Sequence, residues 1–225
     1  MHQFTLIGFL FAINPAIACT VPSFSNLTVQ SNFNLHQFLG IWYEIKWYKN
    51  ETEQDSDIWN DYIQSFKLDN NSNERLIVNG SARLSSEEQC FTFGPWLIIA
   101  NDSAKMILVK ADLESSVDLN WPYYIVETDY NHYALIYGCM SENYIPCKQP
   151  MLWILSRTVL LSNEYLIKLD DYIVDNLCLN ISELQITLHT SQSCYHHSSL
   201  AQKNNFVNEK FLLILLILYL FLTYK

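Results

Sequence analysis

The sequence predicts an all-β fold, an eight-stranded antiparallel up-and-down barrel followed by one C-terminal α-helix. Short runs rich in Tyr, Ile, Val, Phe and Trp recur along the chain, and these residue types favour a pleated, half-buried surface. Polar stretches typical of turns separate the runs, for example residues 69–73 and 101–103. Beyond residue 161 the spacing of apolar residues changes to that of a helix.

The predicted strands follow one another closely, so that neighbours in sequence can pair as antiparallel neighbours. A closed barrel of this size has an interior just wide enough for one small ligand. The eight predicted strands are Trp42–Tyr48, Asp61–Leu68, Leu76–Leu84, Gln89–Ile99, Lys105–Lys110, Tyr123–Thr128, Tyr133–Cys139 and Met151–Arg157. Asn120-Trp121-Pro122 is interpreted as the turn before the sixth strand.

A helix is predicted after the eighth strand. Ser162 supplies a capping residue and Glu164 an acid in the first turn, where it interacts favourably with the helix dipole. Apolar residues then recur at helical spacing, at Leu166, Leu169, Ile173 and Leu177. Residues Gln185–Leu188 are interpreted as a short final strand.

The first residues are typical of a secretory signal. The apolar stretch Phe4–Ala12 is followed by small residues at Ala16 and Ala18, the pattern of a cleavage site. Pro15 argues against the alternative, a buried first helix, because proline breaks a helix interior. We therefore expect residues 1–18 to be a signal peptide and the protein to be secreted.

The C-terminal segment predicts attachment to a membrane. Phe211–Leu222 is wholly apolar but short, because a helix that crosses a bilayer needs about 20 apolar residues. Small residues at Ser199 and Ala201 and a polar spacer precede it, the pattern of a glycosylphosphatidylinositol (GPI) attachment signal. We expect Ser199 to carry the lipid and residues 200–225 to be removed, leaving 19–199 as one domain. A short uncleaved membrane tail is the alternative.

Cysteine and asparagine patterns fit an extracellular chain. All six cysteines lie beyond residue 18, and an even number in a secreted chain indicates disulfides. No Cys-x-x-Cys spacing occurs, so no metal site is expected, and His196-His197 is assigned to a surface segment. Sequons that predict a glycosylated exterior stand at Asn26, Asn50, Asn70, Asn79, Asn101 and Asn180.

Charge and motif content exclude several functions. The formal net charge of −10 disfavours nucleic acids and anionic membrane surfaces as partners. The chain contains no Gly-x-Ser-x-Gly, no phosphate-binding loop and no His-Glu-x-x-His. We therefore expect no enzymatic activity, no catalytic residue and no cofactor. The alternative is a nucleophilic Cys90 inside a predicted strand, which requires an unpaired thiol.

Three short motifs stand in order along the chain. Gly40 precedes Trp42 in Gly-Ile-Trp-Tyr-Glu-Ile, and a glycine there suits a chain that turns into the floor of a barrel. Thr128-Asp129-Tyr130 lies in the middle, and Arg157 ends Leu-Trp-Ile-Leu-Ser-Arg, where its guanidinium can stack on Trp42. From about residue 19 to 194 the chain resembles the lipocalins, most closely the subfamily of apolipoprotein D, the insect bilin-binding proteins and Lazarillo.

The resemblance implies a lipocalin barrel with the helix packed on its outside. It implies that the signature residues Gly40, Trp42, Thr128, Asp129, Tyr130 and Arg157 are structural, with Trp42 and Tyr130 filling the core. Because Lazarillo carries a GPI anchor, the resemblance also favours a lipid anchor over a membrane tail.

Disulfide pairing is expected in part from the same resemblance. The family ties a cysteine ahead of the first strand to the end of the seventh, which implies Cys19–Cys139. The family's cysteine early in the second strand is missing, and we assign Cys90 in its place as the partner of Cys194. Cys147–Cys178 is the pair that remains.

Aromatic residues are the candidates for a ligand pocket. The family's arginine belongs at the closed end, so alternation along the eighth strand directs Trp153 into the lumen. Tyr124 matches a position where apolipoprotein D-like chains carry a pocket aromatic. The predicted ligand-binding residues are Trp153, Tyr124, Tyr137, Leu135, Val126 and Trp47. The alternative is that these side chains only fill a core.

The leading hypothesis is therefore a secreted, GPI-anchored lipocalin that binds and carries small hydrophobic ligands. Lipids, fatty acids, retinoids and bilins are the candidate classes, and a lumen lined by flat rings suits all of them. The alternative is a cell-surface recognition or adhesion glycoprotein with a protein partner on a neighbouring cell, built on the same scaffold.

Overall fold

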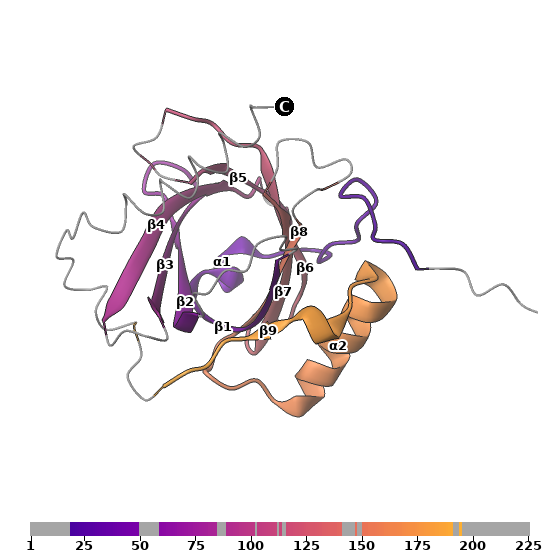
Figure 1. Cartoon of the computed structure of the whole chain (residues 1–225). Coiled ribbons are helices and arrows are strands. Elements are labelled where there is room, and N and C mark those ends of the chain that lie inside the picture. The colour runs from indigo at the N-terminus through magenta and orange to yellow at the C-terminus, as the bar shows by residue number, and fades with distance from the viewer. Residues whose placement is uncertain are drawn as a thin grey trace, which may run out of the picture.

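The computed structural model describes residues 19–49, 59–84, 89–101, 103–111, 113, 116–140, 147, 150–190 and 194. Within these residues eight antiparallel strands close into a barrel, and one long helix lies against its outer wall (Figure 1). The elements are α1 Leu35–Phe38, β1 Gly40–Lys49, β2 Trp59–Leu68, β3 Arg75–Leu84, β4 Cys90–Ile99, β5 Lys105–Lys110, β6 Trp121–Thr128, β7 Tyr133–Cys139, β8 Pro150–Ser156, α2 Asn163–Leu177, the 3-10 helix η1 Ile181–Glu183, and β9 Gln185–Ile186.

The strand order confirms the predicted up-and-down barrel. Each strand from β2 to β8 pairs with the next, β8 pairs with β1, and Gly40–Tyr43 of β1 pairs with Ile63–Phe66 of β2 to close the ring. Two predictions are corrected. Trp121 and Pro122 belong to β6 and not to a turn, and the short helix α1 was not predicted. In the part of the chain that the structure describes, no helix is both long and apolar enough to cross a membrane.

The barrel wall carries a hydrophobic cluster on each face. The inner cluster lies at the closed end and includes Phe38, Trp42 and Phe66. The outer cluster joins the outward side chains of β6, β7 and β8 to Leu169 and Ile173 of α2. Because α2 covers these strands from outside, β7 is buried along its whole length, and the alternation of buried and exposed residues disappears there.

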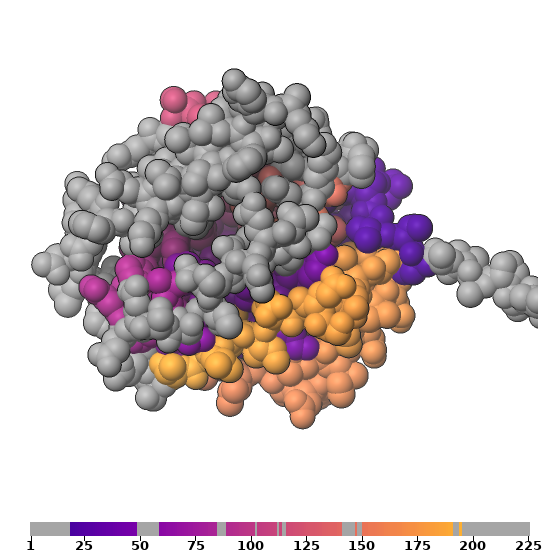
Figure 2. All heavy atoms as spheres, viewed as in Figure 1, coloured from indigo at the N-terminus to yellow at the C-terminus, as the bar shows by residue number. Residues whose placement is uncertain are grey.

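The segment after α2 fills a gap in the wall between β1 and β2. The β1–β2 pairing ends at Tyr43, and beyond it Lys46 and Trp47 of β1 pair with β9 instead. The Leu188 carbonyl then accepts the backbone N–H of Asp61 in β2 at 2.8 Å. Figure 2 shows this orange-to-yellow segment on the surface beside the purple first strands.

The structure corrects two of the three expected disulfides. Cys90 is bonded to Cys194, as expected, which attaches the C-terminal segment to β4. Cys19 is bonded to Cys178 at the end of α2, and Cys139 is bonded to Cys147 eight residues later. Cys19–Cys139 and Cys147–Cys178 were therefore wrong.

Local geometry explains the two pairings. Cys139 ends β7 and Cys147 lies in the connection to β8, whose return brings their Cα atoms within 6.0 Å. Cys178 caps α2 in the left-handed conformation, φ 55°, with its Cα 5.5 Å from that of Cys19. Since no cysteine is free, the alternative of a nucleophilic Cys90 is excluded.

Arg157 joins the parts of the closed end. Its guanidinium carbon lies 3.7 Å from the centre of the Trp42 ring, as the sequence predicted. Its nitrogens donate to the carbonyls of Tyr130 at 2.9 Å, Ile41 at 2.8 Å and Gln37 at 2.9 Å, so one side chain holds the β6–β7 turn, β1 and α1. Burial lowers the pKa of Arg157 to about 10, which leaves it charged at neutral pH.

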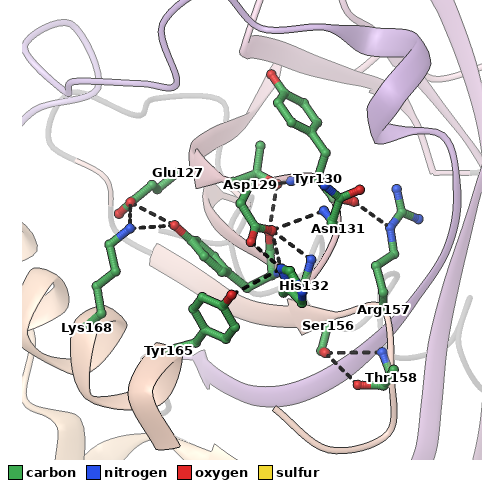
Figure 3. Close-up of polar contacts among 12 residues, drawn as sticks. Glu127, Asp129, Tyr130, Asn131, His132, Ser156, Arg157, Thr158, Tyr165 and Lys168 are labelled. Atoms are coloured by element: carbon green, nitrogen blue, oxygen red, sulfur yellow. Dashed lines mark hydrogen bonds and ion pairs between the residues drawn. The ribbon is translucent and has the colours of Figure 1, made fainter. Parts of the chain in front are cut away.

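The β6–β7 turn beside Arg157 is ordered by Asp129 (Figure 3). Its Oδ1 accepts the backbone N–H groups of Asn131 at 3.1 Å, His132 at 2.7 Å and Tyr133 at 3.1 Å. These hydrogen bonds favour the charged carboxylate and lower the pKa of Asp129, against the effect of burial. Lys168 of α2 pairs with Glu127 and donates to the Tyr133 hydroxyl, so the turn also fixes the start of α2.

We expect Trp42→Ala to destabilise the protein by about 3–5 kcal/mol, because it empties a fully buried aromatic site. Arg157→Ala should cost less, about 1–3 kcal/mol, because water can reach some of the carbonyls it leaves. Urea unfolding of both variants measures the difference. Leu160→Ala, at a side chain that is 81% exposed, is the control and should change nothing. Small, equal losses in the first two variants would contradict the role given to this pair.

Candidate functional site

The inner face of the barrel is sealed at one end. Side chains from α1, β1 and β2 meet there, with Phe38 in contact with Trp42 at 5.2 Å and with Phe66 at 5.0 Å between ring centres. Trp42 also donates its indole N–H to the Phe38 carbonyl at 2.8 Å. The inward side chains at this end are fully buried, so they form the floor on which any lumen site rests.

Above the floor, tryptophans lie where glycines make room for them. A Cβ at Gly80 would lie 2.9 Å from the Trp96 ring, and one at Gly138 would lie 3.2 Å from the Trp153 ring. Trp153 also packs on Tyr123, with 5.6 Å between ring centres. Trp47 stands directly opposite Trp153 in the β1–β8 ladder, so the two share a face.

These upper rings are only half-buried, unlike the floor. Trp47, Trp96 and Trp153 all retain exposed surface although they lie on the inner face. Inward side chains keep exposed surface only where the interior is not filled by the protein itself. These three rings therefore mark the part of the inner face that stays partly accessible above the floor.

A polar group interrupts the apolar lining midway up the barrel. Glu44 of β1 is 4% exposed, and the Thr187 hydroxyl donates to its Oε1 at 2.6 Å. Tyr123 donates its hydroxyl to Oε1 of Gln64 at 2.7 Å, and Nε2 of Gln64 donates to the Tyr62 hydroxyl at 3.5 Å. β1, β2, β6 and the segment after β9 thus all contribute to one polar cluster.

Burial sets the electrostatics of this cluster. It raises the pKa of Glu44 from 4.5 to about 7, because charge is disfavoured away from water, while the Thr187 hydrogen bond partly opposes the shift. Burial, followed by the nearby Glu44 charge, also raises the pKa of Tyr62 far above its usual range. Burial also raises the pKa of Tyr123, and the proximity of Tyr62 and Glu44 adds to the shift.

The structure divides the predicted ligand-binding residues between the two faces. Trp153 and Trp47 lie on the inner face, as expected. The other four were wrongly assigned to the pocket, since they belong to the outer cluster with α2: Tyr124, Val126, Leu135 and Tyr137. Tyr137 stacks on Phe24 of the N-terminal segment at 5.1 Å, and Tyr124 meets the same ring edge-on at 5.4 Å.

The wrong assignment has a physical cause. Both faces of β6 and β7 are buried, so hydrophobicity does not distinguish the lumen side. Tyr124 was placed in the pocket from the resemblance, and a register shift between Ile125 and Glu127 also breaks the alternation along β6. The inward residues of β6 are Tyr123 and Ile125.

The polar cluster was missed although the sequence contained a signal for it. Trp42 faces inward, and a period of two places Glu44 on the same face. By the same period of two, Tyr62 and Gln64 lie on the same face of β2 as the inward Phe66. A tyrosine, a glutamine and a glutamate on faces that also carry floor residues indicate a polar site inside the barrel.

The remaining predicted sites fall in three groups. Gly40 begins β1 with φ 102°, and Thr128, Asp129 and Tyr130 form the closed-end turn. Four sequon asparagines are exposed and Asn79 is half-buried: Asn26, Asn70, Asn101 and Asn180. Asn50 and Ser199 lie outside the described residues. Over the described ranges, no group of three or more His, Cys, Asp or Glu side chains is arranged to hold a metal ion.

Comparison with known proteins finds relatives that cover most of the barrel. Apolipoprotein D from Cavia porcellus is 28% identical over 172 residues, 75% of this chain and 82% of that protein. Retinol-binding protein 4 from Rattus norvegicus is 28% identical over 130 residues, 56% of this chain and 60% of that protein. No family model matches the sequence.

Among solved structures, lobster apocrustacyanin A1 is similar with a TM-score of 0.53 and 19% identity, over 73% of this chain and 84% of that one. At this identity the likeness shows the fold alone. Of these sequence relatives, retinol-binding protein 4 is named for the ligand that it binds. The barrel, the Arg157–Trp42 pair and these relatives agree, and together they support a lipocalin with an apolipoprotein D-like relationship.

Proposed function

We propose that this lipocalin binds small hydrophobic molecules in its barrel lumen and carries them, with lipids, fatty acids, retinoids and bilins as candidate classes. The main support is the set of half-buried inward tryptophans, Trp47, Trp96 and Trp153, above a sealed floor. A relative whose name states that it binds retinol supports the retinoid class.

Binding would be driven by burial of the ligand. A ligand that removes about 300 Å² of apolar surface from water gains roughly 7 kcal/mol before the cost of immobilisation is subtracted. Flat aromatic walls favour extended or ring-shaped ligands over bulky ones. The lumen-facing indoles also make binding observable, because a polyene near Trp153 quenches its fluorescence.

We further propose that the protein is secreted and held at the cell surface by a GPI anchor. Three disulfides support an oxidising compartment. The segments that carry the remaining signals are the signal peptide 1–18 and the attachment propeptide 200–225, which flank the domain 19–199.

A second candidate is a cell-surface recognition or adhesion glycoprotein with a protein partner. The observation that favours it is the exposure of Asn26, Asn70, Asn101 and Asn180, which leaves four sequons open to glycans. Cell aggregation by a variant whose lumen is blocked would favour this candidate over ligand carriage.

Retinol should quench tryptophan fluorescence saturably in the wild-type protein, and Trp153→Ala should weaken binding by about tenfold or more. Tyr137→Phe is a matched control on the outer face of the wall, because its buried hydroxyl has no hydrogen-bond partner. That variant should bind as the wild type does. A wild-type protein that binds no member of a broad apolar panel would turn the proposal toward recognition.

Glu44 should make stability fall as pH rises. Because its pKa in the folded protein is about 7 and its ordinary value is 4.5, the folded state binds the proton more tightly. Relative to Glu44→Gln, the wild type should lose on the order of 3 kcal/mol between pH 4.5 and 8. Urea unfolding of both proteins at these two pH values measures the change. A difference that is independent of pH would contradict the buried, charged carboxylate.

Full-length protein on cells should be released by a phosphatidylinositol-specific phospholipase, leaving a C-terminus at Ser199. Mass spectrometry of the released protein identifies its last peptide. Phospholipase-resistant protein whose C-terminal peptide still contains Phe211 would instead establish a retained membrane tail.

A further inference from the structure

The polar cluster in the lumen carries an acceptor without a donor. Oε1 of Glu44 accepts the Thr187 hydroxyl, whereas no hydrogen bond within the described part of the chain reaches Oε2. Oε2 is also absent from the buried unpaired atoms, so it keeps some accessible surface although Glu44 as a whole is buried. An acceptor so placed is satisfied by a donor that enters the barrel.

We propose that Glu44 binds the head group of the ligand, and that this head group is a hydrogen-bond donor, an amine or an alcohol, rather than a carboxylate. The inference rests on the proposed function, since it names the chemistry of the ligand in the same lumen. It narrows the candidate classes, because it disfavours free fatty acids.

Position supports this role. Glu44 stands opposite Leu155 of the inner cluster, two residues above Trp42 of the floor and below Trp47 on the same strand. A ligand whose head reaches Glu44 therefore places its apolar body among the half-buried tryptophans. One orientation of the ligand then gives its head group a hydrogen bond and its apolar body contact with aromatic rings.

Among the described residues no cationic side chain pairs with the Glu44 carboxylate, and Nε2 of His189 contacts the backbone carbonyl of Glu44 at 2.7 Å rather than its side chain. Lys46 points outward to Asp170 at 2.8 Å, and Arg83 pairs with Asp61 at 3.2 Å. No Lys or Arg in the described ranges forms an ion pair with Glu44. A ligand carboxylate beside it would meet a second negative charge in a low-dielectric site, which is strongly unfavourable. A ligand ammonium group at the same place would be attracted to Glu44 as strongly as a carboxylate would be repelled.

Neighbouring hydroxyls make the site suitable for an alcohol as well. The Tyr62 hydroxyl accepts from Gln64 and donates to no described residue, so its proton is available to a ligand oxygen. An alcohol can therefore donate to Glu44 and accept from Tyr62 at once. Tyr123 is already committed to Gln64 and holds that amide in place.

The test uses ligands with one apolar body and different heads: all-trans-retinol, retinylamine, retinoic acid and retinyl acetate. Dissociation constants are measured by tryptophan quenching at pH 8, where Glu44 is charged. We expect retinol and retinylamine to bind about tenfold or more tightly than retinoic acid. This comparison uses the wild-type protein, so it does not depend on whether a variant folds.

Glu44→Gln then assigns the selectivity to its source. Retinoic acid should bind this variant more tightly than it binds the wild type, and retinylamine should bind it more weakly. The ratio of their dissociation constants should therefore shrink by about fivefold or more. Glu127→Gln, on the outer side of the barrel where Glu127 pairs with Lys168, is the matched control and should keep the wild-type order.

The outcomes separate the two proposals. If none of the four retinoids and no other apolar ligand binds, the proposed function fails. If all four bind with similar affinity, or if Glu44→Gln leaves the order unchanged, ligand carriage stands and the role of Glu44 is overturned.

Discussion

The contact between Arg157 and Trp42 is the constraint on which the rest of the barrel depends. One guanidinium covers the buried indole and donates to carbonyls of α1, β1 and the β6–β7 turn, so it links segments more than a hundred residues apart. Desolvating this charge is unfavourable, and hydrogen bonds to the carbonyls of Tyr130, Ile41, Gln37 and Phe38 offset the cost. With the closed end held in this way, the floor of the barrel does not depend on packing at the opposite end.

Packing outside the barrel matters as much as packing within it. Helix α2 and the N-terminal segment cover β6 to β8, and Cys19–Cys178 bonds these two covering parts to each other. The outer cluster thereby stabilises the wall without taking side chains from the lumen. Because outward side chains stabilise the wall, inward rings such as Trp47 and Trp153 can remain half-buried.

The sequence was sufficient to predict the architecture, but it did not show which side chains of each strand face the lumen. Strand order, the long helix and the Trp42–Arg157 contact were predictable, because alternation, helical spacing and the three motifs each report local structure. Tyr124 and Tyr137 were misplaced because both faces of β6 and β7 are buried, which removes the signal that distinguishes the lumen side. Two disulfide predictions were wrong because the true pairings depend on where Cys19 and Cys147 lie in three dimensions, and spacing in the sequence does not report this.

The bond between Cys90 and Cys194 has a mechanical consequence. Tension applied to the chain beyond Cys194 reaches β4 through a covalent link before it reaches the two ladder pairs that hold β9 to β1. Under the proposed GPI anchoring, the protein would be pulled at that end whenever its cell or its surroundings move. The disulfide therefore transfers such a force into the middle of the sheet. The hydrogen bond between Thr187 and Glu44 then bears little of it.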